Sequence, residues 1–410
     1  YQLSRVSTQQ QQHLQQAKKQ LDGLQNRLLK ENSDWARFAP ALLKDWQTWL
    51  AAEIENNENI ATREIPNPFY FSKPLNPNMG SEVFRGREAT VQHIERLLCD
   101  SQQSLSIVLL APRRSGKSSL LKMLPQLLPQ AVFIFYDLQD NPAEHIEGFF
   151  YSLITQVKTQ TYVERSITLP DRPNETTLSQ SDAWFKQVDE QLTQPLLICI
   201  DEFERLPTLL PNENNDLLRL MAWFRATIQH RQNVRLLISG AAAFDELDRI
   251  WDDHFINLQT LKLPHLSADV CLDLLRQPTA HFPTEVMPPA VAEYIIERTQ
   301  GQPYLTQALA GTGIEYINYH GLKQLELSLM DVIEQQVLER CSGYFRDVYY
   351  SAPKAAQPLF YRLSHGETLD LATENKAAVR WLKQRLLITE AGEVNIPLFA
   401  RWVRDWVERD

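Results

Sequence analysis

The feature that most constrains this chain is the stretch APRRSGKSS at residues 111–119, directly after the apolar run SLSIVLL. The apolar run predicts a buried β-strand, and KSSLLKMLPQLL predicts a helix after the loop. A turn alone would require the glycine but not the lysine, and a solvated charge cluster would require no strand before it. A small residue, four residues of any kind and Gly-Lys-Ser, placed between strand and helix, predict a loop whose backbone N–H groups wrap an anion.

Each residue type in this loop has a physical role in binding a phosphate chain. Gly116 lets the backbone approach the phosphates, Lys117 neutralises β- and γ-phosphate oxygens, and the Ser118 hydroxyl coordinates Mg²⁺. The N-terminus of the following helix adds a partial positive charge. For the two arginines the sequence leaves open a phosphate contact, a contact with a neighbouring subunit, and plain surface exposure. The predicted nucleotide-binding residues of the loop are Ala111, Arg113, Arg114, Ser115, Gly116, Lys117, Ser118 and Ser119.

A second motif, LLICIDEFERL, is an apolar run that ends in two carboxylates. A buried strand of a parallel sheet would deliver Asp201 and Glu202 beside the phosphate loop, because the carboxyl ends of such strands share one edge. Asp201 would hold Mg²⁺ through water, and Glu202 would orient and deprotonate the attacking water. The upstream loop favours this interpretation over a helix N-cap.

Strands and helices alternate between residues 80 and 262, which predicts an α/β fold with a parallel sheet covered on both faces. The stretch 161–181 reads as a polar loop, and helices dominate after residue 265. The C-terminal residues 352–410 look like a winged helix with a hairpin at Ala391-Gly392. The predicted strands are 105–111, 131–137, 195–201, 234–240 and 256–263. The predicted helices are 267–276, 288–300, 303–318, 323–343, 354–363, a short one near 370, and 375–386, before a closing helix.

The first 60 residues predict a helical arm. A short seam of apolar residues with coiled-coil spacing runs through residues 1–31. A second helix over 33–56 places several aromatic residues on one face, which we expect to pack on the arm's own domain, with a dimerisation arm as the alternative. The seam consists of Leu14, Ala17, Leu21, Leu24 and Leu28, and the aromatic face of Trp35, Phe38, Leu42, Trp46 and Trp49.

Together these motifs resemble the P-loop ATPases of the AAA+/STAND group, especially their archaeal and bacterial origin-recognition-like branch. The resemblance covers about residues 80–345 and also rests on VFRGRE (83–88), VRLLISG (234–240) and GQPYLTQ (301–307). It implies ATP or ADP with Mg²⁺ as cofactors. It further implies that Gly86 and Arg87 lie near the adenine, that Ser239 faces the γ-phosphate, and that Pro303 of a helical lid covers the base.

The resemblance also implies an arginine that reaches the γ-phosphate of a neighbouring subunit. Arg225 and Arg231, near the end of the helix before the sensor strand, are the candidates, with a solvated helix end as the alternative for each. No arginine of a second sensor is evident at the start of a lid helix. The implied domains are an arm (1–60), a linker (61–80), an ATPase core (81–264), a helical lid (265–350) and a winged-helix-like domain (351–410).

The expected function is a nucleotide-driven molecular switch that hydrolyses ATP and self-associates according to the bound nucleotide. A protein partner would bind the winged helix or the arm. The alternatives are a DNA-acting ATPase, which would use the basic helix 375–386, and a scaffold that holds nucleotide without hydrolysing it. A net charge of −10 confines DNA binding to a local patch. Four scattered cysteines and the absence of a long apolar run predict a cytoplasmic location, and an upstream membrane or sensor domain stays open.

Overall fold

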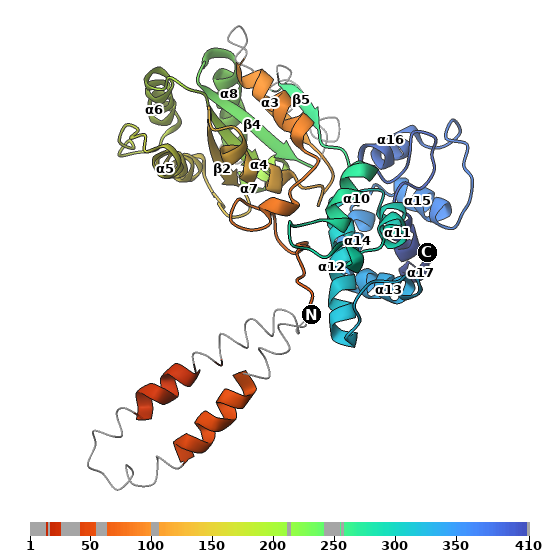
Figure 1. Ribbon diagram of the computed structural model, residues 1–410. Helices are drawn as coiled ribbons and strands as arrows, with labels where there is room; N and C mark the ends of the chain where they lie inside the picture. Colours follow the sequence, from red (N-terminus) through yellow and green to blue (C-terminus); the bar gives the residue numbers. More distant parts are fainter. Residues whose placement is uncertain are drawn as a thin grey trace.

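The computed structural model describes residues 14, 17–25, 42–54, 64–99, 106–210, 215–241, 255 and 258–407. After the N-terminal arm comes a sheet with helices on both faces, and a helical C-terminal part, residues 268–407, follows it (Figure 1). Among the described residues, no helix combines the length and apolar character that crossing a bilayer requires.

In the described part of the chain, five parallel strands form one sheet in the order β2-β3-β4-β1-β5. The residues of β3 and β4 are all buried, because helices cover both faces of a parallel sheet and favour continuous apolar runs. Each strand lies within the range that the sequence predicts for it. The strands are β1 (Ile107–Leu110), β2 (Val132–Asp137), β3 (Leu196–Asp201), β4 (Val234–Gly240) and β5 (Gln259–Lys262).

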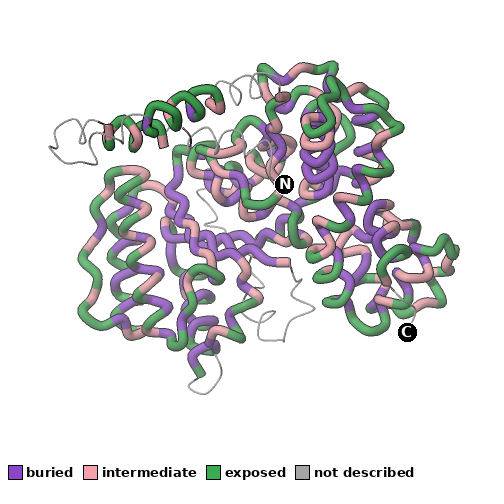
Figure 2. Tube along the Cα trace, turned by 90° about the horizontal axis from the view of Figure 1, so that it is seen from below, coloured by how far each residue is buried: buried purple, intermediate pink, exposed green. Residues whose placement is uncertain are grey.

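Side-chain alternation along these strands builds two hydrophobic cores, one on each face of the sheet. Val108 and Ile198 belong to the core beneath α5 (Ile146–Arg165), α6 (Leu178–Gln191) and α8 (Asp216–His230). Their neighbours Leu109 and Leu197 belong to the opposite core, beneath α3 (Glu88–Cys99) and α4 (Lys117–Leu127). Figure 2 shows the buried strands running between exposed helical surfaces. The predicted loop over 161–181 is partly helical, because α5 continues to Arg165 and α6 begins at Leu178.

The C-terminal part, residues 268–407, is helical and shares one hydrophobic core, which runs from Leu275 to Val403. A buried carboxylate, Glu334, ties three of its helices together by accepting hydrogen bonds from Tyr294, Arg298 and Arg401. The helices are α10 (Ala268–Arg276), α11 (Pro289–Thr299), α12 (Pro303–His320), α13 (Met330–Arg340), α14 (Ser342–Tyr350), α15 (Ala356–Ser364), α16 (Lys376–Gln384) and α17 (Pro397–Trp406). Shorter elements are η1 (Ser81–Val83), η2 (Phe203–Arg205), α7 (Leu206–Leu209), η5 (Thr284–Val286) and η6 (Leu327–Leu329).

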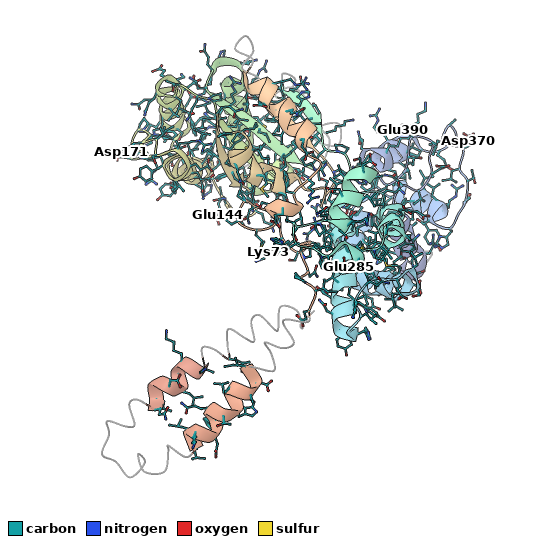
Figure 3. All side chains as sticks on the ribbon, viewed as in Figure 1. Lys73, Glu144, Asp171, Glu285, Asp370 and Glu390 are labelled. Carbon is teal, nitrogen blue, oxygen red and sulfur yellow. The ribbon has the colours of Figure 1, made fainter. Side chains whose placement is uncertain are left out.

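Two elements predicted for this C-terminal part differ from the structure. The helix expected over 323–343 is divided into η6, α13 and α14, with a break at Cys341. The short helix expected near residue 370 is a turn, closed by the Thr373 N–H on the Asp370 carbonyl. The hairpin at Ala391-Gly392 has a single bridge, between Ile388 and Val394. Its acidic residue Glu390 lies at the outer surface (Figure 3). The winged helix therefore stays a prediction.

Residues 64–75 form a strap that lies along α12. The Asn318 amide accepts from the Ile65 N–H at 2.9 Å and donates to the Ile65 carbonyl at 2.8 Å. Further along, the Asn67 amide donates to the Gly311 carbonyl, and Gln307 accepts from the Tyr70 N–H. These side chains satisfy backbone groups that an irregular segment cannot pair with itself. The strap thus joins α12 along its length before the chain reaches the sheet.

The described parts of the N-terminal arm, 17–25 and 42–54, are helical and lie side by side. The Gln47 amide donates to Asp22 at 3.0 Å and to Gln25 at 2.8 Å. Leu43 and Leu50 are buried, whereas Trp46 and Trp49 are 62% and 64% exposed. The prediction that the tryptophan face packs on its own domain is therefore wrong. Leu28, Trp35 and Phe38 lie outside the described residues.

Candidate functional site

The phosphate loop leaves β1 at Ala111 and enters α4 at Lys117. The Ala111 N–H donates to the Gly240 carbonyl at 3.2 Å, which fixes the start of the loop to the end of β4. The loop then turns tightly, because the Ser115 hydroxyl donates to the Pro112 carbonyl at 2.7 Å. Gly116 has a φ of 93°, a conformation that favours glycine, and it caps α4. The loop thus presents a helix N-terminus, where an anion is favourable.

Lys117 lies inside this loop and is 9% exposed. Its Nζ donates to the Ala111 carbonyl at 2.6 Å and to the Pro112 carbonyl at 3.1 Å. Burial lowers the pKa of Lys117, while the Asp201, Glu204 and Glu202 carboxylates act to raise it. A desolvated ammonium held by two neutral carbonyls is a strong partner for phosphate oxygens, which carry full charge.

Asp201 joins the phosphate loop to the neighbouring strand. Its Oδ2 accepts from the Ser118 hydroxyl at 2.5 Å, and its Oδ1 accepts from the Ser239 hydroxyl at 2.8 Å. The strand register explains this meeting, because Asp201 pairs with Ser239 on one side and with Asp137 on the other. The two predicted metal-site residues, Ser118 and Asp201, therefore touch. Their hydroxyl and carboxylate oxygens are the donor types that Mg²⁺ prefers.

Two further carboxylates lie beside Asp201. Burial raises the pKa of Asp137, and the neighbouring Asp201, Asp140 and Glu202 carboxylates raise it further. A hydrogen bond from the backbone N–H of Gln139 acts in the opposite direction. Glu202 has a φ of 58°, and its Oε2 lies 3.3 Å from the Arg205 guanidinium. Its side chain is 39% exposed, so it is open to solvent water.

Gly86 and Arg87 position the loop against the lid. A Cβ on Gly86 would lie 2.7 Å from Val270, so glycine allows α10 to approach. The buried Arg87 guanidinium donates to the Ser115 carbonyl at 2.9 Å and to the Pro264 carbonyl at 2.8 Å. Burial lowers the pKa of Arg87 to about 10. Arg87 therefore joins the phosphate loop to the segment between β5 and α10.

The lid motif reaches the same loop. Gly301 has a φ of 69° and lies so close to Leu266 that a Cβ would be 2.0 Å from the Leu266 carbonyl oxygen. Pro303 begins α12, and Gln302 caps that helix through the Leu305 N–H. The Gln302 amide also donates to the Arg114 carbonyl at 3.1 Å. This contact, which the sequence analysis did not predict, connects lid and loop directly.

The remaining loop residues contact the protein itself. Arg113 pairs with Asp347 of α14 at 2.5 Å, and the Arg114 guanidinium lies 5.0 Å from the centre of the Tyr304 ring. Ser119 accepts from the Leu75 N–H at 3.0 Å and so joins the strap. Tyr304 lies in the GQPYLTQ motif, whereas Asp347 belongs to no motif and only the three-dimensional structure could identify it.

The two candidate arginines, Arg225 in α8 and Arg231 directly after it, differ in how far they are buried. Arg231 is 6% exposed, and its guanidinium pairs with Asp182 at 2.5 Å and stacks near Phe185 and Trp223. Arg225 is exposed on α8. Of the two, Arg225 is the exposed side chain and Arg231 the buried one, and the role of either as a catalytic arginine stays a prediction.

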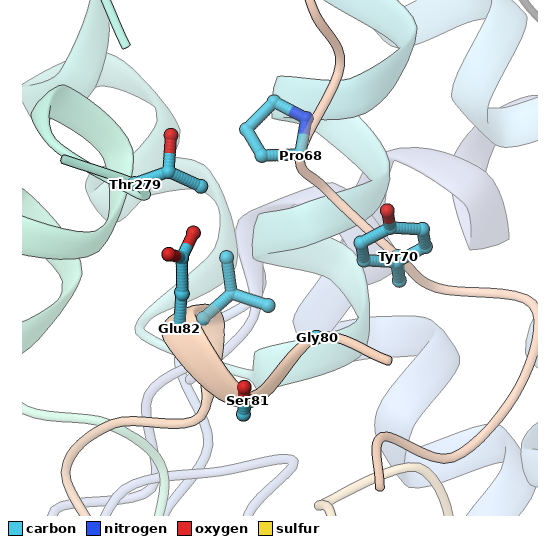
Figure 4. Close-up of a pocket in the computed structure, with 7 residues that line it drawn as sticks. Pro68, Tyr70, Gly80, Ser81, Glu82 and Thr279 are labelled. Carbon is cyan, nitrogen blue, oxygen red and sulfur yellow. The ribbon is translucent and has the colours of Figure 1, made fainter. Parts of the chain in front are cut away.

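A cavity of about 230 Å³ lies between the strap and the segment after α10 (Figure 4). This volume is below the ~300 Å³ at which ligand pockets usually begin. None of the phosphate-loop residues lines it. Its lining residues are Pro68, Tyr70, Gly80, Ser81, Glu82, Val83 and Thr279. In the described part of the chain, no group of three or more His, Cys, Asp or Glu side chains is arranged to hold a metal.

The chain matches one family model and is similar to several solved structures. The family model "Novel STAND NTPase 1" matches residues 78–396. The fold is similar to that of the Aeropyrum pernix ORC1 protein in complex with DNA, with 13% identity, coverage of 80% of this chain and 95% of that one, and a TM-score of 0.45. It is also similar to Cdc6p from Pyrobaculum aerophilum, with 14% identity, coverage of 82% and 98%, and a TM-score of 0.41. The Thermotoga maritima RuvB Holliday junction branch migration motor has 14% identity, coverage of 80% and 96%, and a TM-score of 0.42. The search of curated proteins found no match.

Proposed function

Because the chain belongs to the Novel STAND NTPase 1 family, an AAA+/STAND type of P-loop ATPase, we propose that it binds and hydrolyses ATP with Mg²⁺ and switches conformation or oligomeric state with the bound nucleotide. The observation that supports this most directly is the Asp201 carboxylate, which contacts Ser118 of the phosphate loop and Ser239 of β4. One residue thereby links the site that would bind the nucleotide to the strand that would sense it.

In this proposal, each site residue has a separate role in phosphoryl transfer to water. Lys117 would exchange its two loop carbonyls for phosphate oxygens, and Ser118 and Asp201 would hold the metal. Mg²⁺ bound by these two residues would neutralise charge on the β- and γ-phosphates. Glu202 would take the proton of the attacking water, a role that its exposed position permits. Ser239 would sense the γ-phosphate, and Arg225 of a neighbouring subunit would complete the site.

Lid and loop offer a route from nucleotide state to conformation. Gln302 and Tyr304 of the lid contact Arg114, and Asp347 of α14 contacts Arg113. Anionic phosphates at the loop would compete with Asp347 for the arginine. A ligand shifts an equilibrium only when it interacts differently with the two states, and this competition is such a difference.

Steady-state ATP hydrolysis and ATP binding by the wild type and by Glu202→Gln test the proposal. The wild type should turn over, and the variant should bind ATP with unchanged affinity but lose turnover by about a hundredfold or more. Equal turnover in both would exclude Glu202 as the base. Binding by both with turnover by neither would favour the scaffold that holds nucleotide without hydrolysing it.

DNA binding through α16 remains the second candidate, and the structure reduces its basic surface. Lys383 pairs with Glu390 at 2.8 Å, and the Arg385 guanidinium lies 4.0 Å from the centre of the Trp381 ring. Lys376 and Arg380 remain exposed on this helix. Salt-dependent DNA binding that weakens when both are changed to Glu would support this candidate, and no binding at low salt would exclude it.

A further inference from the structure

Glu204 lies two residues after the predicted base and has no role in the mechanism above. It belongs to η2, the single turn that follows β3. Its Oε1 accepts a hydrogen bond from the Ala241 N–H at 3.0 Å, immediately after the end of β4. Its Oε2 is buried and is without a hydrogen-bond partner among the described residues. A buried carboxylate oxygen without a donor is costly, and in a native structure it calls for an explanation.

The chain makes room for this carboxylate. A Cβ on Gly240 would lie 2.4 Å from Glu204 Oε2 and 2.3 Å from the Phe203 ring. Gly240 lies in a regular buried strand, so the need for glycine here is steric. The Gly240 carbonyl also holds the first residue of the phosphate loop, Ala111. Glu204 therefore lies over the point where β4 and the phosphate loop meet.

The other two carboxylates of this turn are already engaged. Asp201 accepts from Ser118, from Ser239 and from the Glu202 N–H. Glu202 pairs with Arg205. Glu204 is the member of the three with a buried, unpartnered oxygen, within the described residues. Its charge, like those of Asp201 and Glu202, acts to raise the pKa of Lys117 in the phosphate loop.

From this geometry we propose that Glu204 is a second carboxylate of the hydrolytic site: Oε1 fixes the end of β4, and Oε2 accepts a hydrogen bond from the attacking water. This inference rests on the hydrolysis proposed above. In the reaction, the water oxygen forms a bond to the γ-phosphorus as the bond to the β-phosphate bridging oxygen breaks. One water proton passes to Glu202, and the other O–H is held by Glu204. The products are ADP and phosphate.

The test compares Glu204→Gln with a matched control, Glu190→Gln, which makes the same change on the exposed surface of α6. The glutamine can still accept from Ala241 but presents an amide donor in place of Oε2. We expect unchanged melting temperature and ATP affinity, with kcat lowered at least about tenfold. A second readout needs no turnover: binding of ADP with aluminium fluoride and Mg²⁺, which mimics the transferring phosphoryl group. The wild type and Glu190→Gln should bind this complex more tightly than ADP, and Glu204→Gln should lose the preference.

The outcomes separate the two proposals. If the wild type turns over and Glu204→Gln matches Glu190→Gln within twofold, the role of Glu204 is overturned while hydrolysis stands. If melting temperature and ATP affinity fall together with the rate, Glu204 is structural and the inference is again overturned. If the wild type neither turns over nor prefers aluminium fluoride, hydrolysis itself fails and the role of Glu204 falls with it. Should the Gln variant not fold, Glu204→Asp retracts the carboxylate by one methylene, and a wild-type rate in that variant contradicts the proposal.

Discussion

The phosphate-loop lysine and the serine after it are held by hydrogen bonds within the protein. Lys117 donates to the Ala111 and Pro112 carbonyls, and Ser118 donates to Asp201. Phosphate oxygens and Mg²⁺ would replace these contacts one for one. Pre-arranged partners of this kind reduce the side-chain entropy that binding would otherwise lose.

Replacing Gly240 should destabilise the protein, because Phe203 and Glu204 leave no room for a side chain there. Gly240→Ala would place a methyl group within 2.4 Å of both Phe203 and Glu204, inside a buried strand. We expect overpacking to lower the free energy of unfolding by about 1–3 kcal/mol. Gly148→Ala, at an exposed position of α5, is the control, because nothing would lie within 4 Å of its Cβ. Urea denaturation measures both, and equal stability of the two variants would contradict the packing described for Gly240.

Arg231 should behave as a structural residue. Arg231→Ala leaves Asp182 without its guanidinium and removes the stacking near Trp223. Because Asp182 is partly exposed, we expect a loss of about 2–4 kcal/mol, below that of a fully buried pair. Arg225→Ala, on the exposed face of α8, should change stability by less than about 0.5 kcal/mol. A stable Arg231→Ala protein without ATPase activity would instead restore Arg231 as a candidate for the catalytic arginine.

At the scale of elements, the segment between β5 and α10 contains a titratable group, His265. Burial lowers the pKa of His265 to about 4, and the positive charge of Arg87 contributes to this shift. The hydrogen bond to the Gln300 carbonyl acts in the opposite direction. A histidine with a depressed pKa contributes stability that is present above its unfolded pKa of about 6.5 and is lost as the pH falls toward 4. Because the side chain is only partly buried by area, we expect a loss of about 1 kcal/mol between pH 7 and pH 5.

His265→Gln should flatten that pH dependence. His281→Gln, at an exposed position, should leave the dependence as it is in the wild type. Thermal unfolding of the three proteins at pH 5, 6 and 7 measures the difference. Parallel curves for the wild type and His265→Gln would show that His265 is solvated in the folded protein.

The elements also show what the sequence could predict. The five strands follow from apolar runs, and the phosphate loop and Asp201 follow from motifs whose residues are local in the chain. The break at Cys341 and the exposure of Trp46 do not, because packing against distant segments decides both. Arg231 was uncertain for the same reason: its partner Asp182 lies 49 residues away. Glu204 is visible in DEFERL, but the role proposed for it depends on Gly240 of β4 and on Ala241 directly after that strand.

For the whole molecule, we predict that the active site is shared between subunits. The rate per subunit should rise with protein concentration, and Arg225→Ala should lower it by about 10³-fold or more, the usual contribution of an arginine supplied in trans. Mixing Arg225→Ala with Glu202→Gln should restore part of the activity, because each variant supplies the residue that the other lacks. A concentration-independent rate, or a mixture no more active than its components, would place the whole site within one subunit.

The strap has a mechanical consequence for the molecule. Asn318, Gly311 and Gln307 hold residues 65–70 to α12 by four hydrogen bonds, and the next anchor, Leu75 on Ser119, lies at α4. A pull exerted from the N-terminal side would therefore load the lid helix first and the nucleotide-binding helix second. Because the attachments follow one another in this order along the chain, tension on the strap would be transmitted to α12 before it reached α4.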